Sequence, residues 1–162
     1  MLKAKITQKM VNFYDGNVHE VEHFLKVHQY AKLIGTLEGF DEEKMETLEI
    51  ASIVHDIACP TCREKYGNCD GKNQEKESEA LLRPFLEEFA LKSRMEERII
   101  YLVTHHHTVT DIDGEDYQAL IEADFLVNAS EMGLDKKAII EFKDKVAKTV
   151  AGKELLTAIY KL

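Results

Sequence analysis

A polar pair, His55-Asp56, stands at the end of the most hydrophobic helical stretch of the chain. A helix that is apolar on nearly every side is expected to lie in the core of a protein. Burying an imidazole or a carboxylate there is costly unless the group is paired or bound to a metal ion. The stretch before the pair contains Leu48, Ile50, Ala51, Ile53 and Val54. The sequence therefore predicts a buried central helix that brings two titratable side chains into the core.

The rest of the chain also has helical periodicity, and no segment shows the alternation of a β-strand. Asp41 is expected to cap the central helix, and Ser93 with Glu96 fits a capping box. Pro84 should kink or divide its helix, and residues 59–72 are expected to form a polar loop. These features predict an all-α, single-domain bundle of about six to eight helices over residues 1–162. The expected helices cover residues 3–14, 17–37, 41–56, 74–89, 93–107 and 117–131, with one or two more in 135–162.

The charge balance restricts the class of partner. The chain has 21 basic and 30 acidic residues, a net charge of −9, and no basic stripe. This argues against a nucleic-acid polymer as the partner, because such proteins usually present a basic face to phosphates. No apolar run approaches the roughly 20 residues that span a membrane, and no apolar segment follows the N-terminus as in a signal peptide. We therefore expect a cytoplasmic protein, and a small anionic substrate would need a metal ion for local positive charge.

Three cysteines, Cys59, Cys62 and Cys69, fall within eleven residues. Their odd number argues against a disulfide framework in a cytoplasmic chain. The C-x-x-C spacing is compatible with zinc or with a redox pair, although a four-ligand zinc site would lack its last member nearby. We favour the interpretation that all three are reduced thiols without a role at a site.

Further titratable residues interrupt apolar helical segments. Asp124 lies inside the apolar segment 119–127, and His23 can share the inward face of its helix with Val27. Each has an ordinary alternative, since Asp124 can pair with a lysine and the 105–107 histidine run can be a solvated helix end. Together with the central pair, they form the mixture of imidazoles and carboxylates that binds Mn, Fe, Co, Ni or Zn. We therefore predict a site for one or two divalent transition-metal ions.

The order of these residues resembles the HD superfamily of metal-dependent phosphohydrolases. His23-Phe24-Leu25-Lys26-Val27 is similar to the start of the family pattern, and His55-Asp56, His105-His106 and the segment 122–126 follow in the family's order. The resemblance covers about residues 18–130, and residues 135–162 would add C-terminal helices to this HD-type core. It implies that the core metal ligands are His23, His55, Asp56 and Asp124.

The chain departs from the family pattern at two places. Relatives with two ions usually carry another histidine between the His-Asp pair and the later histidines, and Glu77 lies about where it would fall. A second ion would then be held by His105 or His106 together with Glu77, although Glu77 can equally be a solvated helix residue. Some relatives place an acid just after the pair, whereas residues 57–60 here read Ile-Ala-Cys-Pro. The general acid is therefore unassigned.

The resemblance implies hydrolysis of a small phosphate ester, a nucleotide phosphomonoester or phosphodiester, by attack of metal-bound hydroxide on phosphorus. Asp56 would be the catalytic carboxylate that ligates the metal and orients the water. The candidate contacts to the substrate phosphate are Lys26, Arg63, Lys65 and Lys72, whose alternative is a solvated surface position.

Three other functions stay open at this point. One is a non-catalytic module that binds a metal or a nucleotide, and another is a helical protein without metal. The third is a di-iron oxygenase, which the missing middle histidine disfavours. The apolar C-terminal run, residues 138–159, is expected to be either core or the face of a homodimer.

Overall fold

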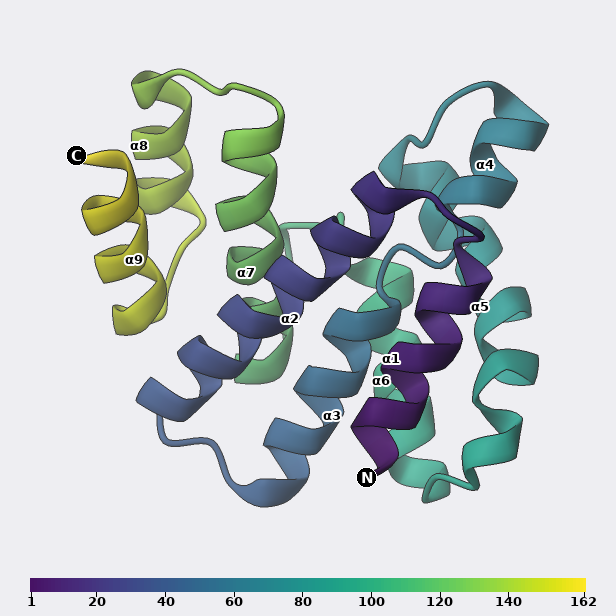
Figure 1. The fold of residues 1–162 in the computed structure, drawn as a ribbon. Helices are drawn as coiled ribbons and strands as arrows, with labels where there is room; N and C mark the ends of the chain where they lie inside the picture. Colours follow the sequence, from purple (N-terminus) through teal and green to yellow (C-terminus); the bar gives the residue numbers. More distant parts are fainter.

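The computed structural model describes residues 1–162, which form nine α-helices, one short 3₁₀ helix and no strand (Figure 1). The predicted all-α fold is confirmed. The helices are α1 (Leu2–Phe13), α2 (Val18–Leu37), α3 (Glu42–Val54), α4 (Cys59–Tyr66), α5 (Gly71–Leu86), η1 (Glu87–Phe89), α6 (Ser93–His105), α7 (Glu115–Glu131), α8 (Lys136–Lys145) and α9 (Val150–Tyr160).

The central helix is α3, which packs against α1, α2, α6 and α7. Every residue from Thr47 to Cys59 is buried, so the chain stays in the core beyond the end of the helix. The predicted cap is present, because the Asp41 side chain accepts a hydrogen bond from the Lys44 amide at 2.8 Å. His55 is the residue that ends α3 and Asp56 follows it, so the polar pair lies in the interior as the sequence predicts.

Two local predictions are wrong. Ser93 is the first residue of α6 rather than its cap, and Lys92, which precedes it, makes no side-chain capping bond. Residues 59–66 form α4 instead of a loop, because Pro60 occupies the first turn, where a missing amide hydrogen costs nothing. Pro84 does interrupt its region as expected, since α5 ends two residues later and continues as the 3₁₀ turn.

The cysteine prediction is also wrong for two of the three residues. Cys59 and Cys69 form a disulfide, and only Cys62 is a free, buried thiol. The reason is the unpredicted helix α4, which ends at Gly67 in the left-handed conformation with φ of 72°. Glycine adopts this conformation without steric cost, so the chain reverses direction and the two Cα atoms come within 5.3 Å.

Figure 1 shows α8 and α9 beside α7 at one end of the molecule, with α4 and α5 at the opposite end. Much of the C-terminal apolar run is core, since Ile139, Ala147, Ala151 and Leu156 are buried. Val150 and Ile159 of the same run are exposed. No helix combines the length and the apolar character that crossing a membrane requires.

Candidate metal centre

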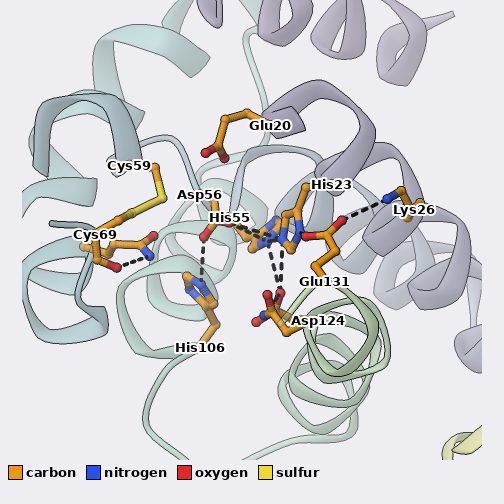
Figure 2. Close-up of polar contacts among 12 residues, drawn as sticks. Glu20, His23, Lys26, His55, Asp56, Cys59, Cys69, His106, Asp124 and Glu131 are labelled. Carbon is orange, nitrogen blue, oxygen red and sulfur yellow. Dashed lines mark hydrogen bonds and ion pairs between the residues drawn. A yellow bond between two sulfur atoms is a disulfide. The ribbon is translucent and has the colours of Figure 1, made fainter. Parts of the chain in front are cut away.

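Four core helices bring five titratable side chains to one point in the interior. His23 comes from α2, His55 and Asp56 from the end of α3, His106 from the end of α6, and Asp124 from α7. All five residues are buried. In Figure 2, His23, His55 and Asp124 meet at the centre of the view, and Asp56 lies between them and His106. The four ligands that the sequence predicted are therefore brought together.

The spacing of four of these side chains suits a single metal ion. The Nε2 atoms of His23 and His55 are 3.2 Å apart. Asp56 Oδ2 lies 3.3 Å from each of these nitrogens. Asp124 Oδ1 lies 3.3 Å from His23 Nε2 and 3.5 Å from His55 Nε2. Ligands at about 2.0–2.2 Å from one ion lie about 2.8–3.6 Å from each other, so these distances fit such an ion.

The second nitrogen of each imidazole is held by another group. His23 Nδ1 lies 2.8 Å from Glu131 Oε2, and His55 Nδ1 lies 2.8 Å from the Ser52 carbonyl oxygen. Because both partners only accept hydrogen bonds, Nδ1 carries the proton in both rings and Nε2 faces the cluster. Carboxylates and carbonyls hold metal-binding histidines in this way. The sequence analysis missed Glu131, whose signal is its position seven residues, or two turns, after Asp124.

The histidines and aspartates of the cluster shift one another's pKa values when no metal ion is bound. Burial opposes an imidazolium at His23, but its hydrogen bonds with Asp124 and Asp56 raise the pKa to about 11. Burial also opposes charge at His55, whereas the Asp56 charge and the Asp124 contact raise that pKa to about 10. Burial works against the two carboxylates as well, yet the adjacent histidines hold both aspartate pKa values below their usual range. The protons of the His23 and His55 imidazoles thus occupy the place of a divalent ion, and binding of the ion would release them.

His106 approaches the other oxygen of Asp56. Its Nδ1 donates to the Val103 carbonyl at 2.8 Å, so Nε2 points toward the centre with its lone pair. This Nε2 lies 3.4 Å from Asp56 Oδ1, and neither atom has a hydrogen-bond partner. Two buried acceptors without a donor are what a cation would stabilise. Asp56 therefore presents one oxygen to the four-residue cluster and one to His106.

Two residues predicted for a second ion lie outside the cluster. His105 Nδ1 is 2.8 Å from the Tyr101 carbonyl, and the His105 ring stacks on the Tyr101 ring. Glu77 accepts hydrogen bonds from Lys65 and Tyr66 at 2.6 and 2.7 Å. Of the predicted second set, only His106 reaches Asp56. The reason is helical phase, because consecutive residues of α6 point in directions about 100° apart.

A cavity of about 390 Å³ opens beside the cluster and is lined by Asp56 and His23. Of the four predicted phosphate contacts, only Arg63 lines it, with its guanidinium bonded to Glu20. Lys26 is paired with Glu131, Lys65 is paired with Glu77, and Lys72 is exposed. Glu20 is a buried lining residue that the sequence analysis missed, although it lies one turn before His23 on the same helix face.

A larger hollow of about 980 Å³ lies elsewhere, at the N-terminal ends of α3 and α6. Its walls are mostly charged surface residues such as Glu42, Lys92 and Glu97, and it contains none of the cluster residues. We therefore place the candidate site at the smaller cavity.

Comparison with models of protein families identifies the family of this chain. The family model described as HD domain matches residues 21–150, a span that includes every residue of the cluster. No curated protein matches the chain.

Proposed function

The chain belongs to the HD domain family, and we propose that it is a metal-dependent phosphohydrolase of a small phosphate ester. Family members are in general metal-dependent hydrolases. The observation that carries the proposal is the set of two Nε2 atoms and two carboxylate oxygens spaced 3.2–3.5 Å apart in the core. This mixture of imidazole and carboxylate favours Mn, Fe, Co, Ni or Zn.

The residues that would hold the ion are His23, His55, Asp56 and Asp124, and His106 with Asp56 Oδ1 offers a place for a second one. A bound ion supplies Lewis acidity, which lowers the pKa of water and polarises a phosphoryl oxygen. Asp56 lines the cavity and has a free acceptor oxygen, so it can orient the attacking water by accepting a hydrogen bond. The buried surroundings of the cluster exclude bulk water and strengthen these interactions.

Arg63 is the best candidate for binding the substrate phosphate. Its side chain is 45% exposed, and its only ion-pair partner is Glu20 at the cavity wall. A phosphate entering the cavity would compete with Glu20 for the guanidinium, whose planar fork suits two phosphate oxygens. The three lysines predicted for this role do not line the cavity.

The cavity volume favours a small substrate. At about 390 Å³ it lies near the lower end of ligand sites, which range over roughly 300–1,000 Å³. A phosphomonoester of nucleotide size or smaller fits this range better than a dinucleotide does. We therefore propose a nucleotide or comparably small phosphomonoester in preference to a large phosphodiester.

A non-catalytic module that binds metal or nucleotide is the second candidate. The observation that favours it lies just after the polar pair, where Ile57 and Ala58 are fully buried and offer no proton donor. Such a module would bind the ion and a phosphate without turnover. A di-iron oxygenase would need a complete second ligand set, and His105 and Glu77 lie away from the cluster.

The test is elemental analysis of protein purified without added metal, for the wild type, Asp56→Ala and the exposed control Asp144→Ala. We expect about one or two equivalents of a transition metal in the wild type and the control and none in Asp56→Ala. Phosphate release from monoesters and diesters is then measured with added Mn²⁺, Co²⁺ or Ni²⁺. Metal without turnover would favour the binding module. Failure to take up metal even on reconstitution would contradict both candidates.

A further inference from the structure

Four buried side-chain atoms of the protein lack a hydrogen-bond partner, and all belong to residues at or beside the cavity. Asp56 Oδ1 and His106 Nε2 face each other at 3.4 Å and are accounted for by the metal centre. The other two are Gln74 Oε1 and His107 Nε2, and both residues line the cavity. The proposed hydrolysis gives neither of them a role.

Gln74 is oriented by its own amide. It lies in the first turn of α5 and is 4% exposed. Its Nε2 donates to the Cys69 carbonyl oxygen at 3.2 Å, next to the Cys59–Cys69 disulfide that lines the same wall. Because the nitrogen is fixed in this way, Oε1 is left as an acceptor. A buried acceptor without a donor is unfavourable, and a ligand that donates to it would be bound more tightly for that reason.

His107 lies against the same end of α5. A Cβ atom added to Gly71 would come within 2.7 Å of the His107 Cβ and Cγ atoms, so this close approach requires glycine. The His107 ring also packs on His106, with ring centroids 3.8 Å apart. One wall of the cavity therefore presents an amide oxygen and an imidazole nitrogen, held between the disulfide and the metal centre.

The chemistry of this wall restricts what it can recognise. The amide oxygen of Gln74 carries no positive charge, and the cavity is also lined by Glu20, Asp70 and Glu131. A second phosphate would meet mostly negative charge there, with Arg63 as the one arginine in the lining. A hydroxyl group fits better, because it donates to Gln74 Oε1 and pairs with an imidazole nitrogen in either tautomer.

We propose that Gln74 and His107 form a subsite for the hydroxyl groups of the leaving group, which makes the substrate a small sugar phosphate monoester. The sugar is either a free sugar or the ribose of a nucleotide. This inference rests on the proposed function, because the substrate phosphate is taken to lie at the metal centre. Gln74 and His107 thereby determine specificity without touching the reacting phosphorus.

The test compares ribose 5-phosphate with pentyl phosphate, which has five carbons and no hydroxyl groups. Their phosphonate analogues, which cannot be hydrolysed, are titrated calorimetrically into metal-loaded protein, and kcat/KM is measured for the two esters. We expect the wild type to prefer the sugar by at least about tenfold in both readouts, since a site built to bind hydroxyls rejects analogues without them. In Gln74→Met and His107→Phe the preference should fall at least about fivefold, mainly through Kd and KM.

The matched control is Gln8→Met, the same substitution at an exposed position of α1, which should keep the preference. An unchanged preference in both cavity variants would overturn the inference. Loss of a metal equivalent in Gln74→Met or His107→Phe would also overturn it, because that residue would then be a metal ligand, and His107 lies near the possible ligands His106 and Asp124. If the wild type binds the sugar phosphonate selectively but hydrolyses neither ester, the proposed hydrolysis fails and the subsite stands. Equal binding of both phosphonates to the wild type would overturn the subsite whether or not turnover occurs.

Discussion

Near the middle of helix α7, two buried carboxylates, Glu122 and Asp124, lie in opposite kinds of surroundings. Two residues along a helix turn the side chains by about 200°, so Glu122 faces α9 and Asp124 faces the metal centre. Glu122 Oε1 accepts from Gln118 Nε2 and from the amides of Lys148 and Thr149, at 2.7, 2.7 and 3.0 Å. The Thr149 hydroxyl donates to the other oxygen. Glu122 thus joins α7 to the start of α9.

Asp124 has a different set of neighbours. One neutral donor, Asn128 Nδ2, lies 2.8 Å from Oδ1. The imidazoles of His23 and His55 lie 3.3 and 3.5 Å from the same oxygen, and those of His106 and His107 are also near. Neutral donors keep their hydrogens at every ordinary pH, whereas imidazoles can exchange a proton for a metal ion. Glu122, the structural acid, is thus surrounded by N–H and O–H groups. The acid proposed to bind metal, Asp124, is surrounded by imidazoles, which can give up their protons.

The largest expected effect is the loss of metal affinity when Asp124 is substituted. Asp124→Asn keeps the size of the side chain and removes a ligand charge. We expect metal affinity to fall more than about 100-fold, beyond the roughly 10- to 100-fold loss typical of residues that only support a ligand. Metal titration followed by calorimetry measures the loss. Normal metal binding by Asp124→Asn, or a variant that is unfolded as isolated, would contradict the role of Asp124 as a metal ligand rather than a structural acid.

The converse substitution is Glu122→Ala, which leaves the buried amide and hydroxyl groups of Thr149 without an acceptor. We expect the free energy of unfolding to fall by about 3 kcal/mol, because each unpaired buried group costs roughly 1–3 kcal/mol. The melting temperature should drop by about 6–12 °C at this chain length. Urea denaturation measures the loss, and metal content per folded molecule should stay at the wild-type value. Loss of the ion with unchanged stability would reverse the assigned roles.

Helical periodicity alone could not distinguish Asp124 from Glu122, and the family resemblance singled out Asp124. Both acids stand in one apolar segment, and helical periodicity marks each as buried. Two of the four donors to Glu122 are the backbone amides of Lys148 and Thr149, and a backbone amide leaves no trace in residue type. The partners of Asp124 are histidines, which the sequence displays. Side-chain chemistry was therefore predictable where its partners were side chains.

Other parts of the site depended on geometry that residue patterns do not contain. His105 and His106 are neighbours in the sequence, and the rotation of about 100° between them decides which ring faces Asp56. Glu77 was the expected ligand on α5 because it lies about where relatives with two ions carry a further histidine, yet the cavity wall is formed one turn earlier, at Gln74. The disulfide depended on the reversal after α4, which the predicted loop did not contain.

A smaller effect is expected from the carboxylate that supports His23. Glu131 holds His23 Nδ1 and is also paired with Lys26. Glu131→Ala should lower metal affinity about 10- to 100-fold, because the ring loses its orientation and part of its basicity. Calorimetric metal titration checks this result, with Glu22→Ala, exposed on the same helix as His23, as the matched control. An effect as large as that of Asp124→Asn would mean that Glu131 is itself a ligand.

The smallest effect concerns the pH dependence of stability in the metal-free protein. The pKa of His23 rises from 6.5 to about 11 on folding, and that of His55 to about 10. A pKa raised by folding contributes stability that is fully present below pH 6.5 and is lost as the pH rises through the folded values. The urea midpoint of the metal-free protein should therefore decline from about pH 7 toward pH 10.

Asp124→Asn should flatten that decline, because it removes one of the charges that raise both histidine pKa values. Glu122→Ala should shift the whole curve downward without flattening it, since the donors around Glu122 do not titrate in this range. If the urea midpoints of the wild type and the two variants changed with pH in parallel, the histidines would not hold their protons in the folded state. The difference between Glu122 and Asp124 would then rest on metal binding alone.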